Sequence, residues 1–327
     1  MKYLITGITG FLGPHLVNKL IKEGHSVYGL VRINNGREND IRDIVNDENF
    51  NKITFLYGDL IDFRMINKIF KDNAFDGVFH LAAQSHPPTS FIDPIMTWET
   101  NVMGSVNLIT AILDNQPKCK LLFCSSVEVY GHEGHDGRKI KEDNVILPAN
   151  PYGASKAAID LYIQERMKNN QINAVVVRPF CYTGPRRGSK FSISSDAIQI
   201  ARMVLGKQEK KLRIGNLDTL RVVSDVRDIA NAFFMIMIHP NTSGQVYNVT
   251  SGDAKKMRYY TETLLKHANL DDVEQVIDEK LWRPIDIQYQ DGDSQKLIDE
   301  VGWTPEYKIE ETLKDLLDYW VVKISKN

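Results

Sequence analysis

The sequence lacks the features that would point to a membrane or to nucleic acid. No apolar run approaches the ~20 residues that a membrane-spanning helix needs. The 40 Lys and Arg residues nearly balance the 42 Asp and Glu residues, for a net charge of −2. That balance offers no electrostatic attraction to nucleic acid or to an anionic membrane. The chain starts with MKYLITGITG and enters a strand pattern at once, so we expect no signal peptide.

Cysteine is also scarce. The 327 residues include 3 cysteines, Cys119, Cys124 and Cys181, whose spacing matches no metal-binding pattern. So few cysteines suit a reducing compartment, and we expect a cytoplasmic protein. Cys124 stands in an apolar strand pattern, which favours inert packing. We also expect no metal, because the histidines near the motifs described below form no ligand pattern: His80, His86, His132 and His135.

What the sequence does contain is a regular alternation of short apolar strands and helices. Such alternation predicts a parallel sheet covered on both faces, that is, an α/β fold of the Rossmann type with a doubly wound parallel sheet. Helices are expected after the first strand, around residues 98–113 and over 152–167. The expected strands are residues 2–6, 26–32, 53–57, 77–81, 121–124 and 174–178.

The alternation becomes less regular after Arg178. Residues 245–249 are predicted to form one more strand of the main sheet, whereas the stretch after Ser251 is predicted to be helical and to end in a turn at 303–305. The chain therefore leaves the sheet, returns once and leaves again, which predicts a smaller, discontinuous α/β lobe. The expected division is residues 1–178 and 219–249 for the domain that contains the main sheet, and 179–218 and 250–327 for the lobe.

Three glycines follow the first strand in the segment 6-TGITGFLG-13. Gly7 permits a tight turn, Gly10 lets the backbone approach a pyrophosphate, and Gly13 allows the next helix to pack closely on the sheet. The amino terminus of that helix offers unpaired N–H groups to phosphate. The spacing GxxGxxG differs from GxGxxG, and a plain strand–turn–helix is the alternative. The position between a strand and a helix favours dinucleotide binding.

The end of the second strand favours NADP over NAD. It carries Arg32 and Arg37 and no acidic residue, and arginine accommodates a ribose 2′-phosphate where an acid would bind the 2′-hydroxyl. Two solvated loop arginines remain the alternative. Asp59 is placed to meet the adenine end of the cofactor, although aspartate is also a common turn residue.

A second motif, 152-YGASK-156, places Tyr152 and Lys156 on one face of a helix. A tyrosine with a pKa near ~10 is a poor base at neutral pH. A neighbouring ammonium is expected to lower that pKa, and Lys156 is placed to bind the nicotinamide ribose. YxxxK is frequent by chance on helices, so it is informative here because it follows a dinucleotide-binding pattern.

These motifs, together with 80-HLAAQSH-86, resemble the extended short-chain dehydrogenase/reductase family over nearly the whole chain. Within it, the chain resembles the GDP-mannose 4,6-dehydratase family and the sister family of GDP-4-keto-6-deoxymannose reductases. The segments that carry this resemblance include 4-LITGITG-10, 29-GLVR-32, 151-PYGASK-156, 184-GPRRGSKF-191, 224-SDVRDI-229 and 283-RPIDIQ-288.

The resemblance implies two binding sites. Arginine suits bidentate phosphate binding, although each arginine could instead pair with a surface acid. Cys181 stands where the family usually has asparagine, and Val222 and Val223 replace an acidic–aromatic pair, so the sugar is left open. Besides the residues already named, the implied cofactor-binding positions are Thr9, Phe11, Leu12, Leu60, Leu81, Ala82, Ala83, Ser85 and Pro179. The implied substrate-binding positions are Ser85, His86, Ser126, Glu128, Cys181, Arg187, Asn216, Arg221, Arg283 and Asp286.

Glu128 carries the functional prediction. A carboxylate at the end of a buried strand costs free energy unless it has a partner or a use. If the fifth strand continues through 121-LLFCSSVEVYG-131, Ser126 and Glu128 share a face. The resemblance places that face beside Tyr152 and against the sugar. A glutamate at a solvent-exposed strand end is the alternative.

The catalytic set implied by the resemblance is Ser126, Glu128, Tyr152 and Lys156. It implies an NADP-dependent GDP-sugar 4,6-dehydratase: oxidation at C4, elimination of water across C5 and C6 with Glu128 as acid and base, and hydride return to C6. A GDP-4-keto-6-deoxyhexose reductase or a 4-epimerase is the closest alternative. A non-catalytic dinucleotide sensor is a third.

The resemblance also implies self-association. Family members pair through a four-helix contact, which here would use the helices at 98–113 and 152–167. The basic pair Arg186-Arg187 resembles a segment that reaches into the cofactor site of a neighbouring subunit. We therefore expect a homodimer or a homotetramer.

Overall fold

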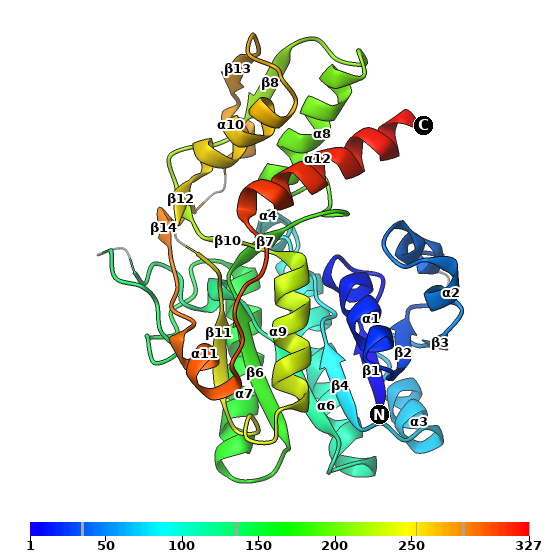
Figure 1. Ribbon diagram of the computed structural model, residues 1–327. Helices are drawn as coiled ribbons and strands as arrows, with labels where there is room; N and C mark the ends of the chain where they lie inside the picture. Colours follow the sequence, from blue (N-terminus) through cyan, green and yellow to red (C-terminus); the bar gives the residue numbers. More distant parts are fainter. Residues whose placement is uncertain (34–35, 135–136, 253, 283–284, 327) are drawn as a thin grey trace.

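The computed structural model describes residues 1–33, 36–134, 137–252, 254–282 and 285–326. Its main body is a parallel seven-stranded sheet in the order β11-β6-β5-β4-β1-β2-β3 (Figure 1). The order reverses between β1 and β4, and ligands of such folds bind in the crevice at that point. The predicted Rossmann-type fold is confirmed. The strands are β1 (Lys2–Thr6), β2 (Ser26–Val31), β3 (Ile53–Tyr57), β4 (Gly77–His80), β5 (Lys120–Cys124), β6 (Ala174–Pro179) and β11 (Val246–Val249).

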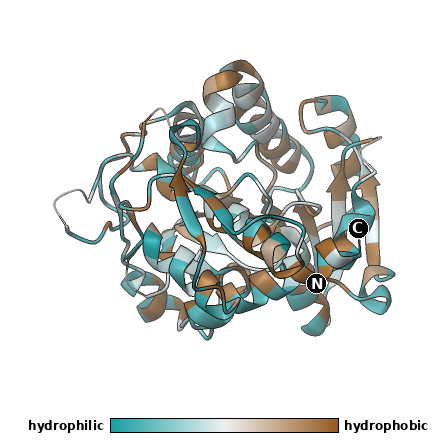
Figure 2. Cartoon of the chain, turned by 90° about the horizontal axis from the view of Figure 1, so that it is seen from above, coloured by the Kyte–Doolittle hydropathy of each residue, from teal (hydrophilic) through white to brown (hydrophobic). Residues whose placement is uncertain are grey.

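Helices cover both faces of this sheet. Alternate strand residues enter two separate cores: Tyr3 and Ile5 pack with α1 (Leu12–Lys22) and α9 (Val226–Ile238). Leu4 packs on the other side, with α3 (Phe63–Asp72), α6 (Gly104–Asn115) and α7 (Pro151–Lys168). This two-fold alternation is what a strand buried on both faces requires. In Figure 2 the helices carry brown and teal residues along their turns, as helices with one buried side do. Short helical segments at the sheet's β2–β3 end are η1 (Glu38–Asp43) and α2 (Asp47–Phe50).

The helix expected around 98–113 is longer and interrupted. It runs through α5 (Pro94–Trp98), a π-helical turn η2 (Glu99–Met103) and α6. Asn101 in that turn is buried and donates hydrogen bonds to the Gln84 carbonyl and the Ser155 hydroxyl, at 3.0 and 2.9 Å. Such π-turns often occur at functional sites, and this one ties the loop after β4 to helix α7.

Several segments after β6 form a lobe above the sheet in Figure 1. Helices α8 (Ser192–Val204), α10 (Met257–His267) and α12 (Ile309–Ser325) surround a core of their own. The prediction of a helical tail that ends at 303–305 is wrong, because short strands lie within it and α12 follows the turn. The remaining elements are α4 (Pro87–Ile92), η3 (Val127–Val129), β7 (Cys181–Thr183), β8 (Lys211–Ile214), β9 (Leu220–Arg221), β10 (Val223–Asp225), β12 (Lys255–Lys256), β13 (Glu274–Ile277), η4 (Glu279–Leu281), β14 (Tyr289–Gln290) and α11 (Gln295–Val301).

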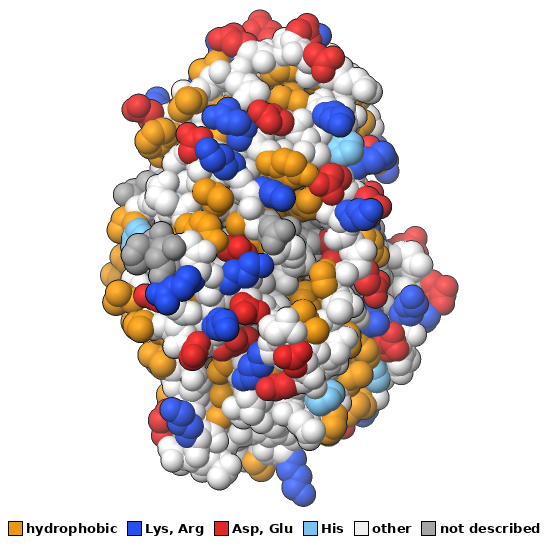
Figure 3. All heavy atoms as spheres, turned by 60° about the vertical axis from the view of Figure 1, so that its left-hand side comes forward, with side chains coloured by type: hydrophobic (Ala, Val, Ile, Leu, Met, Phe, Trp, Pro, Cys, Tyr) orange, Lys and Arg blue, Asp and Glu red, His pale blue; other side chains and the backbone are white. Residues whose placement is uncertain are grey.

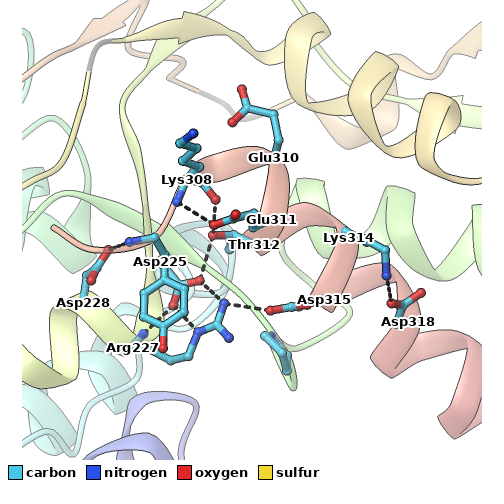
Figure 4. Close-up of polar contacts among 12 residues, drawn as sticks. Asp225, Arg227, Asp228, Lys308, Glu310, Glu311, Thr312, Lys314, Asp315 and Asp318 are labelled. Carbon is cyan, nitrogen blue, oxygen red and sulfur yellow. Dashed lines mark hydrogen bonds and ion pairs between the residues drawn. The ribbon is translucent and has the colours of Figure 1, made fainter.

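A polar cluster joins the lobe to the sheet (Figure 4). Asp225 caps α9 and accepts hydrogen bonds from the Arg227 guanidinium and from the Thr312 hydroxyl of α12, the latter at 2.7 Å. Asp228, in the first turn of α9, accepts the backbone N–H groups of Glu306 and Tyr307. The first turn of α9 therefore holds the start of α12, and the segment just before it, against the main domain.

The surface carries charges of both signs. On the face shown in Figure 3, Lys and Arg side chains are interspersed with Asp and Glu. Within the described ranges, no helix combines the length and the apolar character that crossing a bilayer requires.

Candidate active site

A cavity of about 940 Å³ runs from the glycine-rich loop to the lobe and brings the predicted site residues together. Arg283 lies outside the described residues. All the other predicted positions line this cavity: Gly7, Thr9, Gly10, Phe11, Leu12, Gly13, Arg32, Arg37, Asp59, Leu60, Leu81, Ala82, Ala83, Ser85, His86, Ser126, Glu128, Tyr152, Lys156, Pro179, Cys181, Arg187, Asn216, Arg221 and Asp286.

The glycine-rich loop fits a dinucleotide. Gly7 adopts a φ of +73°, and a Cβ there would lie 2.7 Å from the Ala82 nitrogen. A Cβ on Gly13 would lie 2.2 Å from the Ile8 carbonyl oxygen, so only glycine allows this close packing. Helix α1 has no side-chain cap and no acidic residue in its first turn. Its N–H groups are therefore available to a phosphate.

Arg186 closes over this loop from the lobe side. Its guanidinium donates to the carbonyl oxygens of Thr9 (2.8 Å), Asp40 (2.9 Å) and Gly10. Within the single chain Arg186 therefore binds the glycine-rich loop, and the expectation that the Arg186-Arg187 segment reaches a neighbouring subunit stays a prediction. The residue has a φ of +73°, a left-handed conformation that is uncommon outside glycine.

The segment after β5 reaches the cavity by a turn. The expectation that the strand continues through Glu128 is wrong: β5 ends at Cys124, and Val127–Val129 form the 3₁₀ turn η3. Ser126 caps that turn, and its hydroxyl oxygen accepts from the Glu128 N–H at 3.2 Å. Ser126 and Glu128 are both buried and both line the cavity, although strand alternation does not place them there.

Asn150, which the sequence analysis missed, ties Glu128 to the helix that carries the tyrosine and lysine. Its amide Nδ2 donates to Glu128 Oε2 at 2.7 Å, while its Oδ1 accepts from the Gly153 N–H at 2.8 Å and so caps α7. A Cβ on Gly153 would lie 2.5 Å from the Glu128 carbonyl oxygen. The sequence signal was an N-cap residue directly before a proline, Asn150-Pro151.

Tyr152 and Lys156 lie together at the bottom of the cavity, both less than 10% exposed. Contrary to the sequence-based expectation, the pKa of Tyr152 is raised, chiefly because burial disfavours the phenolate, while a hydrogen bond with the Ser126 side chain lowers it. Lys156 donates to the Cys124 carbonyl oxygen at 2.5 Å, and burial lowers its pKa. In this state Ser126, rather than Lys156, is the polar partner of the phenol.

A buried ion pair lies beside the turn η3 that carries Glu128. The Asp160 carboxylate accepts from Arg178 Nε and Nη2, both at 2.9 Å, and from the hydroxyl of Ser125 at 2.6 Å. Arg178 also donates to the phenol oxygen of Tyr130 at 2.7 Å. Because Ser125 and Tyr130 bracket Ser126 and Glu128, this pair fixes both ends of the turn.

Two arginines line the cavity on the lobe side in different ways. The Arg187 guanidinium lies 3.4 Å from the centre of the Phe191 ring and 4.7 Å from that of Phe11, and burial lowers its pKa. Arg221 is buried and lies 3.4 Å from Asp286, which also accepts from Asn216 at 2.9 Å. Arg221 therefore has an acidic partner, as the alternative of a paired arginine anticipates, although the pair is not at the surface.

In the ranges that the structure describes, no group of three or more His, Cys, Asp or Glu side chains is arranged to hold a metal ion. His80, for example, is fully buried between the hydroxyls of Thr6 and Ser105, at 2.7 and 2.8 Å. Burial lowers its pKa to about 3, so it stays neutral. Its role here is to join β4 to β1 and α6.

The parallel sheet with a glycine-rich turn, and the Tyr–Lys pair beside the end of the fifth strand, define an extended short-chain dehydrogenase/reductase. A family model described as GDP-mannose 4,6 dehydratase matches residues 4–316. The chain belongs to that family.

Individual relatives carry different names. The chain is 30% identical to a GDP-6-deoxy-D-mannose reductase of Pseudomonas aeruginosa, over 99% of this chain and 98% of that one. It is 28% identical to GDP-mannose 4,6 dehydratase 1 of Arabidopsis thaliana, over 96% of this chain and 88% of the relative. Among solved structures, RMD from Pseudomonas aeruginosa complexed with NADPH matches with a TM-score of 0.82 and 29% identity, covering 98% of this chain and 99% of that chain.

Proposed function

We propose that this protein is an NADP-dependent GDP-sugar 4,6-dehydratase that converts GDP-mannose to GDP-4-keto-6-deoxymannose. The observation that carries the proposal is the position of Glu128. Its carboxylate is buried, faces the same cavity as Tyr152 and is oriented by the Asn150 amide. A reaction that only moves hydride at C4 needs no second acid–base group, whereas elimination of water does.

The cofactor of the proposal is NADP, with NAD as the alternative. Arg32 and Arg37 line the cavity beyond the end of β2, where a 2′-phosphate would lie. The relative in the P. aeruginosa complex binds NADPH. Bound NADP would accept hydride from C4 of the sugar and return it at C6.

The protein's own residues supply proton transfer and orientation. Tyr152 takes the O4 proton, and Ser126, already hydrogen-bonded to it, holds the O4 position. Glu128 then removes the C5 proton, which the new C4 ketone acidifies, and protonates the departing C6 hydroxyl. When hydride returns to C6, C5 takes up the proton that Tyr152 holds. Asn150 keeps the carboxylate in place through both transfers.

Lys156 is expected to exchange its bond with the Cys124 carbonyl for the nicotinamide ribose when the cofactor binds. That movement would bring the ammonium next to Tyr152. It would also lower the phenol pKa at the moment when a base is needed.

A 4-keto reductase of the same sugar nucleotide is the second candidate. The P. aeruginosa relative is named a reductase, and its match at 30% identity covers both chains almost completely. Tyr152, Lys156 and Ser126 are sufficient for hydride delivery to C4. A 4-epimerase would use the same three residues.

Incubation of the purified protein with GDP-mannose and catalytic NADP separates these candidates. The dehydratase produces a nucleotide sugar lighter by one water without net formation or loss of NADPH, as mass spectrometry and absorbance would show. NADPH consumption only with the 4-keto sugar would select the reductase. An unchanged mass with altered stereochemistry would select the epimerase.

We further propose that residues 1–178 and 219–249 bind the cofactor and that residues 179–218 and 250–327 bind the GDP-sugar.

A homodimer would form through α5–α6 and α7, where four apolar side chains are exposed to solvent: Ile95 (72% exposed), Trp98, Met103 and Leu161. Such a cluster on the surface of a monomer usually marks an interface. The three unbridged cysteines suit the cytoplasm.

A further inference from the structure

One buried carboxylate in the cavity has no place in the reaction described above. Asp196, in the second turn of α8, is 5% exposed and lines the lobe end of the cavity. Its Oδ2 accepts a hydrogen bond from the Thr261 hydroxyl at 2.8 Å. Among the described residues, no cation lies within ion-pair distance of Asp196, and no second hydrogen bond reaches it.

Burying a carboxylate with so few partners is unfavourable. Burial raises the Asp196 pKa to about 7, and the Thr261 hydroxyl lowers it only in part. The surroundings are apolar, since α8 packs here against Leu212, Leu217 and Met257. A core position of this kind normally carries an apolar residue, so the open acceptor facing the cavity needs a partner that the chain itself does not supply.

The position of Asp196 indicates which part of a ligand it meets. A sugar carbon that reacts must lie beside Tyr152 and the nicotinamide, and the dinucleotide fills the cavity from the glycine-rich loop onwards. The rest of the substrate therefore extends into the lobe end, which Gly215, Leu217, Thr219 and Met257 line together with Asp196. Apolar walls with one acceptor suit the flat face and the donor edge of a nucleobase.

We propose that Asp196 is the specificity-determining residue for the nucleobase, and that its carboxylate accepts hydrogen bonds from N1–H and the 2-amino group of guanine. The inference rests on the proposed function, which places a nucleoside diphosphate sugar in this cavity. Thr261 is the positioning residue that holds the carboxylate in the apolar wall.

The chemistry of the bases explains the choice. Guanine presents two adjacent donors, N1–H and the 2-amino group, to an acceptor-only side chain. Uracil and thymine present one N–H between two carbonyl oxygens, which a carboxylate repels. A site built around a buried acceptor strongly rejects analogues that leave it unpaired. Asp196 would thus exclude pyrimidine nucleotide sugars without touching the sugar.

The test is calorimetric titration of the NADPH-loaded protein with GDP, IDP, XDP and UDP. Inosine lacks the 2-amino group, so IDP is expected to bind about 10- to 100-fold more weakly than GDP, the range for one charge-assisted hydrogen bond. UDP should bind at least 100-fold more weakly. In Asp196→Asn the amide donates to a C2 carbonyl and accepts from N1–H, so XDP should bind more tightly than GDP.

Thr261→Val, which removes the hydroxyl but not the carboxylate, is the matched control and should keep the preference for GDP over IDP. NADPH affinity should be unchanged in both variants. Equal affinity of the parent for GDP and IDP, or an equal loss of all nucleotides in Asp196→Asn, would overturn the inference while leaving the proposed function intact. Failure of the parent to bind any of the four nucleotides would overturn the proposed function and, with it, the inference.

Discussion

Two buried aspartates, one beside the turn η3 and one in the lobe, show opposite ways of placing a carboxylate inside the protein. Asp160 accepts hydrogen bonds from four side-chain donors, those of Ser125, Gln164 and, twice, Arg178. Asp196 accepts one, from Thr261. A carboxylate whose oxygens all accept hydrogen bonds from the protein stabilises the fold. A carboxylate beside a cavity that can still accept hydrogen bonds is suited to bind a ligand.

Breaking the first arrangement should have the largest effect on stability. Asp160→Asn leaves the Arg178 guanidinium buried without its counter-charge, and removing one partner of such a pair costs about 3–5 kcal/mol. Urea unfolding measures the loss. Asp318→Asn, which breaks the exposed pair with Lys314, is the control and should cost no more than about 0.5 kcal/mol. A loss for Asp160→Asn as small as that of the control would remove the distinction between the two aspartates.

Glu128 combines features of both aspartates: its carboxylate accepts a hydrogen bond from the Asn150 amide, and it also lines the cavity. Glu128→Gln keeps an oxygen for the Asn150 amide but removes the acid–base group. Water elimination should slow about 100- to 1000-fold. Mass spectrometry of the product measures elimination, and oxidation at C4, followed as NADPH absorbance in a single turnover, serves as the internal control because it does not use Glu128. Elimination at the parental rate would refute its assignment as the acid and base.

The pH dependence of stability should show that Asp196, unlike Asp160, is buried without a cationic partner among the described residues. Its folded pKa of about 7 lies above the ordinary aspartate value of 3.8, so the unfolded chain releases this proton at lower pH than the folded protein does. The stability it contributes in its protonated form is present below pH 4 and is lost as pH rises to 7 and beyond. Between pH 5 and pH 8, nucleotide-free parent should lose about 2–3 kcal/mol relative to Asp196→Asn. Parallel stability curves for the two proteins would contradict this.

The smallest effect is expected for Asn150, which supports Glu128 without reacting. Asn150→Ser keeps a cap for α7 but has no amide to donate, so kcat for elimination should fall about tenfold, as for one hydrogen bond, with stability nearly unchanged. Asn150→Ala also removes the cap and should cost about 1 kcal/mol more. An equal loss of stability in both variants would show that the residue acts only as a cap.

The fold could be predicted from the sequence because its signals are local. The strands at residues 2–6 and 53–57 lie where the apolar runs predict them, and Gly7 and Gly13 meet the backbone where the motif requires glycine. The gathering of Tyr152, Ser126 and Glu128 in one cavity followed from the family resemblance. The roles of these residues stay predictions until they are tested.

What the sequence did not reveal depends on contacts between distant segments. The strand β5 ends because Ser125 forms hydrogen bonds with Val177 and Asp160, which are 35 or more residues away in the sequence. The residues that follow therefore form a turn, although their sequence is compatible with a strand. The direction of the Tyr152 pKa shift depends on burial, which spacing does not encode. Asp196 stands among serines in 192-SISSD-196 and reads as a solvent-facing helix residue until the lobe is folded around it.

The main sheet is completed by β11, which pairs with β6 but follows it by 66 residues or more along the chain. During synthesis on the ribosome, the β6 edge therefore stays uncovered until the first piece of the lobe has been made. An uncovered strand edge can pair with another chain. A nascent chain that stalled before residue 246 would present this edge to other chains.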